Sequence, residues 1–224
     1  MITIKQSTFD FISSLIDNNN RNWFNDNKAS YDSAKENIDN FAEAVLTKVK
    51  LIDPSINPDV TAKTCVMRIY RDIRFSKDKT PYKNNFGIGI SSNGKGGNEP
   101  GYYIQIQPNN NFIAGGLWMP ESNQLKAIRQ EIDYNTQDIL SILNSKRFKN
   151  YFTTLDQEHQ LKTTPKDYDA SHEYIDLLKL KSFTVTHRLS NEDLLSKNAL
   201  DKVVEVIQEI YPLTVFLKQA INPI

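Results

Sequence analysis

Residues 64–118 contain four runs in which apolar and polar side chains alternate with the period of a β-strand. The runs cover 64–70, 84–92, 101–107 and 112–118. Parallel neighbours would need a crossover connection of about a dozen residues or more. The connections SNGKGGNEPG (92–101) and PNNN (108–111) are instead short and rich in turn residues. We therefore expect these strands to form an antiparallel meander.

A fifth alternating run, 182–188, comes late in the chain, between segments with helical spacing. Apolar residues follow a helical stripe over 38–52, and similar patterns recur over 120–143 and 199–220. This order predicts an α+β fold: an antiparallel five-stranded sheet, a meander plus a late fifth strand, packed with helices from both ends of the chain. We interpret residues 1–224 as a single domain.

The overall charge gives no reason to expect a polyanionic partner. The chain has 27 basic and 27 acidic side chains and a pI near 6.8, which does not favour binding of nucleic acid or an anionic membrane. No apolar run is long enough to span a bilayer, and the N-terminus lacks the pattern of a signal peptide. Cys65 is the single cysteine, so an internal disulfide is excluded. We expect a cytoplasmic protein.

The positive charge is concentrated in RIYRDIRFSKDKTPYKNNF (68–86). Between Arg68 and Lys83 there are six cations and only two anions, Asp72 and Asp78, which leaves a local charge of +4. Aromatic side chains alternate with these charges, so the stretch does not resemble a flexible basic tail. We predict a loop between two strands, and we regard this loop as the place where a ligand would bind.

One face of the predicted sheet is polar and contains glycines, and it has two interpretations. It can be the solvated face that antiparallel sheets commonly have. It can also be a binding platform on which glycines leave space and Arg, Gln and Tyr donate hydrogen bonds. The residues of this face are Arg68, Tyr70, Gly87, Gly89, Tyr103, Gln105, Gln107, Thr184, Thr186 and Arg188.

The loop also has two interpretations. Arginine forks suit phosphate and carboxylate groups, but Arg68, Arg71 and Arg74 can converge only if the chain turns after Tyr70. Alternatively, Asp72 and Asp78 hold the arginines in a structural ion-pair network. The candidate ligand-binding residues are Arg68, Arg71, Asp72, Arg74, Lys79, Tyr82, Lys83, Tyr103, Gln105 and Arg188.

Signals for metal or nucleophilic chemistry are weak. The three histidines, His159, His172 and His187, are scattered and show no metal-ligand spacing, so we expect no metal site. No arrangement of serine, histidine and acid can be identified from the spacing. The sequence indicates neither a cofactor nor a reaction type.

Several long segments resemble a known family. RDIRFSKDKTPYK (71–83) is similar to the signature of the uncharacterised family called domain of unknown function 2461. The likeness extends to NNNRNWFNDNKASY (18–31), to GGLWMPESNQLKAIRQEI (115–132) and to LKTTPKDYDASHEYIDLLKLKSF (161–183), where the family usually has glycine in place of Asp167. The resemblance implies one globular α+β domain and draws attention to residues 71–83. The family has no assigned activity, so it implies no catalytic roles.

Two functions from different classes fit these features. The first is binding of a small anionic ligand with a phosphate or carboxylate group, by an enzyme or a binding protein, in which Asp72 is the nearby candidate base. The second is a non-catalytic module whose basic surface docks an acidic protein or a nucleic-acid backbone. A concave pocket with converging arginines would favour the first function, and a broad flat basic face would favour the second.

Overall fold

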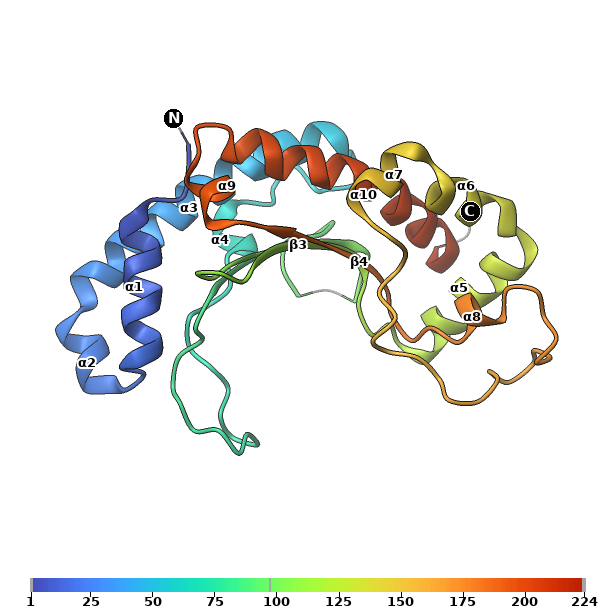
Figure 1. The fold of residues 1–224 in the computed structure, drawn as a ribbon, viewed down its shortest axis with the longest axis horizontal. Coiled ribbons are helices and arrows are strands. Elements are labelled where there is room, and N and C mark those ends of the chain that lie inside the picture. The colour runs from blue at the N-terminus through green and yellow to red at the C-terminus, as the bar shows by residue number, and fades with distance from the viewer. Residues whose placement is uncertain (1, 97, 223–224) are drawn as a thin grey trace. The chain divides into compact units, whose positions relative to one another are not determined.

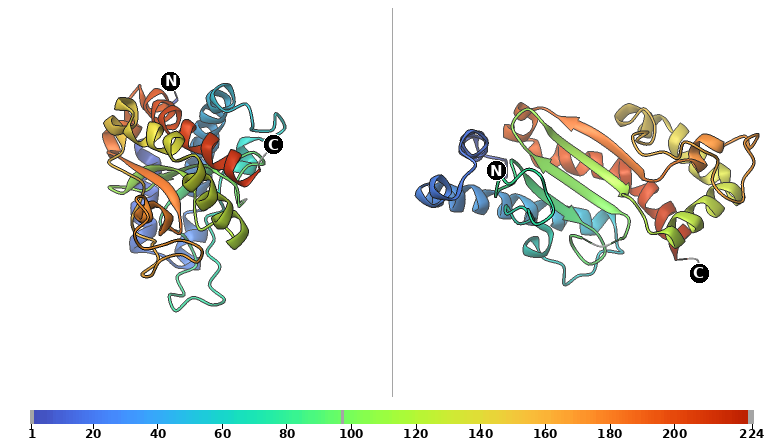
Figure 2. Two further views of the ribbon diagram at one scale, coloured as in Figure 1. Left: turned by 90° about the vertical axis from the view of Figure 1, so that its right-hand side faces the viewer. Right: turned by 90° about the horizontal axis from the view of Figure 1, so that it is seen from below.

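The computed structural model describes residues 2–96 and 98–222 and has an α+β fold (Figure 1). Its strands form a four-stranded antiparallel sheet in the order β1-β2-β3-β4, and Figure 2 shows them side by side. The strands are β1 (Phe86–Ile90), β2 (Gly101–Ile106), β3 (Asn111–Leu117) and β4 (Phe183–Leu189). Consecutive strands are neighbours in the sheet, which confirms the antiparallel arrangement predicted from the short turns.

Helices occupy the regions before and after the β1–β3 meander. They are α1 (Gln6–Asp17), α2 (Arg21–Asp26), α3 (Lys28–Ile52), α4 (Ala62–Cys65), α5 (Ser122–Tyr134), α6 (Thr136–Asn144), α7 (Lys146–Tyr151), α8 (Ile175–Leu178), α9 (Asn191–Leu195) and α10 (Ala199–Ile221). None of the helices within residues 2–96 and 98–222 is long and apolar enough to cross a membrane.

The predicted strand at 64–70 is wrong. Thr61 and Thr64 form a capping box, in which each side chain accepts from the backbone N–H of the other residue, and this stabilises the short helix α4. The chain then makes only isolated antiparallel bridges, from Val66 to Ile88 and from Tyr70 to Tyr82. Within the described residues the sheet therefore has four strands rather than five.

The chain packs as two compact units, each made of separate stretches of sequence. Unit 1 is Met1–Gly96, Tyr103–Ile113 and Arg188–Glu205, and unit 2 is Gly97–Tyr102, Ala114–His187 and Val206–Ile224. Strands β2, β3 and β4 each contribute residues to both units. The interpretation of the chain as a single domain stays a prediction.

In unit 1 the long helix α3 provides much of the core. The predicted apolar stripe is confirmed, because Ile38, Phe41 and Val45 are all fully buried. Helix α3 packs against α1 and against strand β1, in which every residue is buried. This packing fixes the strand that follows the basic loop, and so it positions the exit of that loop.

In unit 2 helix α10 approaches β3 closely. A Cβ atom on Gly115 would lie only 2.4 Å from Cγ2 of Ile210, so glycine is required at this contact. The Tyr102 hydroxyl forms a 3.1 Å hydrogen bond with Oγ1 of Thr214 on the same helix. Helix α10 continues through Pro212. The sheet is thus covered by helices from both ends of the chain, by α3 in unit 1 and by α10 in unit 2.

Candidate functional site

The basic loop, 71–83, is closed by backbone pairing. Tyr70 and Tyr82 form an antiparallel bridge. The N–H of Arg71 donates to the carbonyl of Pro81 at 2.9 Å, and the N–H of Lys83 donates to that of Ile69 at 2.8 Å. The chain therefore turns after Tyr70, as a convergence of the arginines requires. We call residues 69–71 and 78–83 the base of the loop, and residues 72–77 its tip.

An asparagine side chain connects this base to the N-terminal helices. Since the bridge uses the carbonyl of Pro81 and the N–H of Lys83, the backbone groups of Tyr82 itself face away from Tyr70. They pair with Asn19 instead: its Oδ1 accepts from the Tyr82 N–H at 3.1 Å, and its Nδ2 donates to the Tyr82 carbonyl at 3.0 Å. The amide of Asn19 thus satisfies both backbone groups of Tyr82.

Helix α2 starts directly after this contact. The side chain of Asn20 accepts from the N–H of Trp23 at 3.0 Å and caps the helix. Phe24, on the same helix, stacks on Tyr82 with ring centroids 4.0 Å apart and planes inclined by 13°. Both rings are buried, at 1% and 4% exposure. Capping, stacking and the Asn19 hydrogen bonds therefore hold α2 against the base of the loop.

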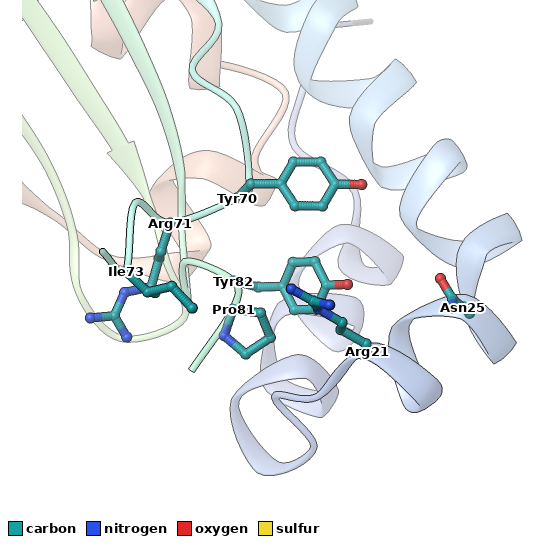
Figure 3. Close-up of a pocket in the computed structure, with 7 residues that line it drawn as sticks. All are labelled: Arg21, Asn25, Tyr70, Arg71, Ile73, Pro81 and Tyr82. Atoms are coloured by element: carbon teal, nitrogen blue, oxygen red, sulfur yellow. The ribbon is translucent and has the colours of Figure 1, made fainter. Parts of the chain in front are cut away.

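A pocket of about 340 Å³ lies between α2 and the base of the loop (Figure 3). Its lining comes from two segments far apart in the sequence. Helix α2 contributes Arg21 and Asn25, and the loop contributes Tyr70, Arg71, Ile73, Pro81 and Tyr82. In Figure 3 the phenol groups of Tyr70 and Tyr82 point the same way, and the guanidinium of Arg21 overlaps the Tyr82 ring in that view.

The two arginines of the pocket differ in their partners. Arg71 donates to the carboxylate of Asp78 and to the hydroxyl of Thr80. Arg21 has no carboxylate within ion-pair distance among residues 2–96 and 98–222. The pocket therefore contains one cation that is shared with an internal carboxylate and one that is not.

Asp78 is held as an anion by the loop itself. The backbone N–H of Thr80 donates to its Oδ1 at 2.9 Å, and the Thr80 hydroxyl donates to the same oxygen. The Thr80 N–H, the guanidinium of Arg71 and the Thr80 hydroxyl together lower the pKa of Asp78 to about 2. At neutral pH Asp78 is ionised and competes with any external anion for Arg71.

Arg74 and Asp72 form a separate pair at the tip. Arg74 donates to both carboxylate oxygens of Asp72, from Nε at 3.0 Å and from an Nη at 2.6 Å. Hydrogen bonds from Arg74, first from its side chain and then from its backbone, lower the pKa of Asp72. A carboxylate that has a lowered pKa and accepts three hydrogen bonds is a weak base. Arg74 and Asp72 do not line the pocket, and Lys79 donates to the Ile73 carbonyl at 2.9 Å.

Two further cations lie near the base. Arg68 is exposed and Lys83 is half-buried, and neither has a carboxylate within ion-pair distance in the described part of the chain. Burial lowers the pKa of Lys83, and the positive charges of Arg68 and Lys95 lower it further. These side chains extend the positive surface beyond the pocket but do not line it.

The sheet residues of the predicted site lie elsewhere and bond to one another. The Tyr103 hydroxyl donates to Gln105 at 3.4 Å, and Gln105 donates to the carbonyl of Asn110 at 3.2 Å. Arg188 donates to the side chain of Asn110, also at 3.2 Å. Of the candidate residues, Arg71 and Tyr82 come together in the pocket with Tyr70.

The glycines of β1 serve internal packing. A Cβ atom on Gly87 would lie 2.9 Å from the ring and hydroxyl of Tyr103, and 3.1 Å from the sulfur of Met67. A Cβ atom on Gly89 would lie 3.3 Å from Cβ of Lys95. The space above these glycines is therefore filled by the protein's own side chains.

Sequence reasoning missed Arg21, Asn25, Ile73 and Pro81 as lining residues. Ile73 and Pro81 belong to the loop but are not charged, so a search for charge did not identify them. Arg21 and Asn25 were detectable in principle, because residues four apart on a helix share a face and Asn20 is a recognisable cap. Arg21 and Asn25 lie beside the loop because Asn19 and Phe24 contact Tyr82. No rule of sequence spacing predicts these contacts.

Comparison with known proteins identifies a family. The family described as conserved hypothetical protein (DUF2461) matches residues 7–216, which is most of the chain. The protein belongs to this family. Searches of curated proteins and of solved structures gave no significant match. The resembling segments 18–31 and 71–83 are the two that meet at the pocket.

Proposed function

We propose that the protein binds a small anionic ligand, bearing a phosphate or carboxylate group, in the pocket between α2 and the base of the loop. The observation that carries this proposal is that Arg21 and Arg71 line the same pocket while Arg21 has no carboxylate partner in residues 2–96 and 98–222. A volume of about 340 Å³ suits a small molecule, because ligand pockets commonly measure about 300–1,000 Å³.

Arg71 would exchange its partner when the ligand binds. Its bond to Asp78 keeps the guanidinium oriented in the free protein, and the Asp78 side chain is 59% exposed, so this bond is accessible to competition from solution. The phosphate or carboxylate of a ligand would replace Asp78 as the partner of Arg71. For Arg21 it would be the first anionic partner. Asn25 and the phenols of Tyr70 and Tyr82 supply further hydrogen-bonding groups.

Titration calorimetry with inorganic phosphate tests the proposal. Arg21→Ala and Arg71→Ala should each weaken binding by about tenfold or more, because each removes a charged hydrogen-bond donor. Arg74→Ala is the matched control, since it removes the same charge from the same loop outside the pocket, and it should change the affinity less than about twofold. Equal losses in Arg71→Ala and Arg74→Ala would point to general loop charge and reject the pocket.

A variant with the opposite effect sharpens this test. Asp78→Asn removes the carboxylate that competes for Arg71, so phosphate should bind more tightly than to the parent protein. Asp72→Asn removes the same charge at the tip and should leave the affinity nearly unchanged. If the two variants increase the affinity equally, the effect comes from net charge and not from release of Arg71.

The tip of the loop supports a second candidate, docking of an acidic protein. Phe75 is 96% exposed, and Arg74 lies over its ring at 5.9 Å. An exposed aromatic side chain beside cations is a feature of protein-binding surfaces. Binding of polyglutamate that is lost in Phe75→Ala and retained in Arg21→Ala would favour docking over the pocket.

A further inference from the structure

The pocket contains an aromatic surface that the charges alone do not explain. Tyr70 is 49% exposed, although its ring lies only 5.5 Å from the buried ring of Tyr82 and 6.1 Å from that of Phe24. Phe24, Tyr82 and Tyr70 thus form a cluster of three aromatic rings, and Tyr70 is its exposed member at the pocket. The exposed part of the Tyr70 ring is apolar surface that a ligand can cover.

The position of this ring is fixed before any ligand arrives. Tyr70 lies in the backbone bridge to Tyr82, and the hydrogen bonds of Arg71 to Pro81 and of Lys83 to Ile69 flank that bridge. Tyr82 is in turn held by Asn19 and stacked on Phe24. A preorganised ring costs little conformational entropy when a ligand stacks on it.

The polar groups of the pocket indicate where the anionic group of the ligand would bind. In Figure 3 the guanidinium of Arg71 is turned away from that of Arg21, and in the free protein it binds Asp78. Once released from Asp78, Arg71 could bind one oxygen of the anion while Arg21 binds another, which suits the three terminal oxygens of a phosphate better than the two of a carboxylate. The Tyr82 phenol is protonated at neutral pH, as an ordinary tyrosine is, and burial raises its pKa further, so it can donate to such an oxygen.

We infer that the preferred ligand is a planar ring that carries a phosphate, with the ring on Tyr70 and the phosphate on Arg21 and Arg71. This inference rests on the proposed anion binding and adds the class of ligand. A planar ring gains from the exposed face of Tyr70, whereas a bare anion cannot. Stacking of a ring on an aromatic side chain typically changes affinity by about tenfold or more.

Titration calorimetry with phenyl phosphate, cyclohexyl phosphate and inorganic phosphate tests the inference on the unmodified chain. Phenyl phosphate should bind about tenfold more tightly than inorganic phosphate. It should also bind more tightly than cyclohexyl phosphate, which has a similar size but no planar ring. Benzoate carries a planar ring with a carboxylate, so equal binding of benzoate and phenyl phosphate would overturn the assignment of a phosphate.

Variants of Tyr70 locate the effect. Tyr70→Ala should remove the advantage of phenyl phosphate over inorganic phosphate, so that the two ligands bind this variant with affinities within about twofold of each other. Tyr70→Phe retains the ring and should keep the advantage. If the advantage is absent in the parent protein, or persists in Tyr70→Ala, the inference fails.

The same titrations separate this failure from a failure of the proposed function. If inorganic phosphate binds, if this binding depends on Arg21, and if phenyl phosphate binds no more tightly, the anion site stands and only the preference for a planar ring is rejected. If none of the phosphates binds the parent protein, both the anion site and the ring preference are rejected.

Discussion

The base and the tip of the loop contain similar side chains in different surroundings. At the base the side chain of Arg71 is 27% exposed, whereas at the tip that of Arg74 is 77% exposed. Tyr82 at the base is buried against Phe24, while Phe75 at the tip has no such cover. Both arginines pair with an aspartate, so charge alone does not distinguish them. Except for Ile73, the loop residues that line the pocket belong to the base.

The largest expected difference concerns the aromatic side chains. Phe24→Ala should lower the free energy of unfolding by about 3–5 kcal/mol, because it leaves a cavity beneath Tyr82. Phe75→Ala, the matched change at the tip, should stay within about 0.5 kcal/mol. Denaturant unfolding of the two variants measures both values. Similar losses in the two variants would mean that the tip is packed as firmly as the base.

The second difference concerns Asn19. Asn19→Ala should lower the free energy of unfolding by about 1–3 kcal/mol, because it leaves the N–H and carbonyl of Tyr82 without their partners. Asn25→Ala is the control on the neighbouring helix, where the side chain is exposed, and should have little effect. Amide exchange should also accelerate at Tyr82 in Asn19→Ala. Unchanged exchange there would contradict the role of Asn19 as a clamp.

The third and smaller effect concerns the ion pairs. In Arg74–Asp72 the side chains are 77% and 44% exposed, so Arg74→Ala should leave the unfolding midpoint unchanged. Arg71→Ala should also leave global stability nearly intact, but amide exchange should increase within 72–80 because Thr80 and Asp78 lose a shared donor. Losses in both variants as large as that of Phe24→Ala would make the loop a structural network and remove the argument for a ligand site.

Much of the sheet could be predicted from the sequence. The period of two and the short turns identified β1, β2, β3 and β4 to within about two residues. The strand at 64–70 failed because alternation was given more weight than the pair Thr61 and Thr64, whose hydroxyls cap a helical turn.

Of the residues that form the candidate site, only those of the basic loop could be predicted from the sequence. Charge density identified Arg71, and the family resemblance included the segment that holds Arg21. In one of the two interpretations of the polar face the glycines left space for a ligand. Tyr103 and Met67 fill that space at Gly87, and this is a tertiary contact that no local pattern encodes. At position 167 the family usually has glycine, and this chain has aspartate. Asp167 adopts φ of 74°, in the left-handed region that glycine favours and aspartate tolerates, so the family pattern agrees with the backbone here.

The smallest effect is the titration of the two loop carboxylates, which compares base and tip directly. The pKa of Asp78 is lowered from 3.8 to about 2, so its interactions stabilise the loop above pH 3.8 and are lost as the pH falls from there through about 2. Carbon-detected NMR of the side-chain carboxyl should give this value in the parent protein. An apparent pKa near 3.8 for Asp78 would contradict the geometry of the base.

Arg71→Ala and Arg74→Ala should return the pKa values of Asp78 and Asp72 toward 3.8 to different extents. The largest cause at Asp78 is the backbone N–H of Thr80, which remains in Arg71→Ala, so its pKa should rise only part of the way to 3.8. At Asp72 the largest cause is the side chain of Arg74, and Arg74→Ala should restore its pKa more completely. Asp78 would then be held mainly by the backbone of the loop and Asp72 mainly by one exposed side chain. Under the proposed function, that difference would allow Asp78 to release Arg71 to a ligand and stay in place.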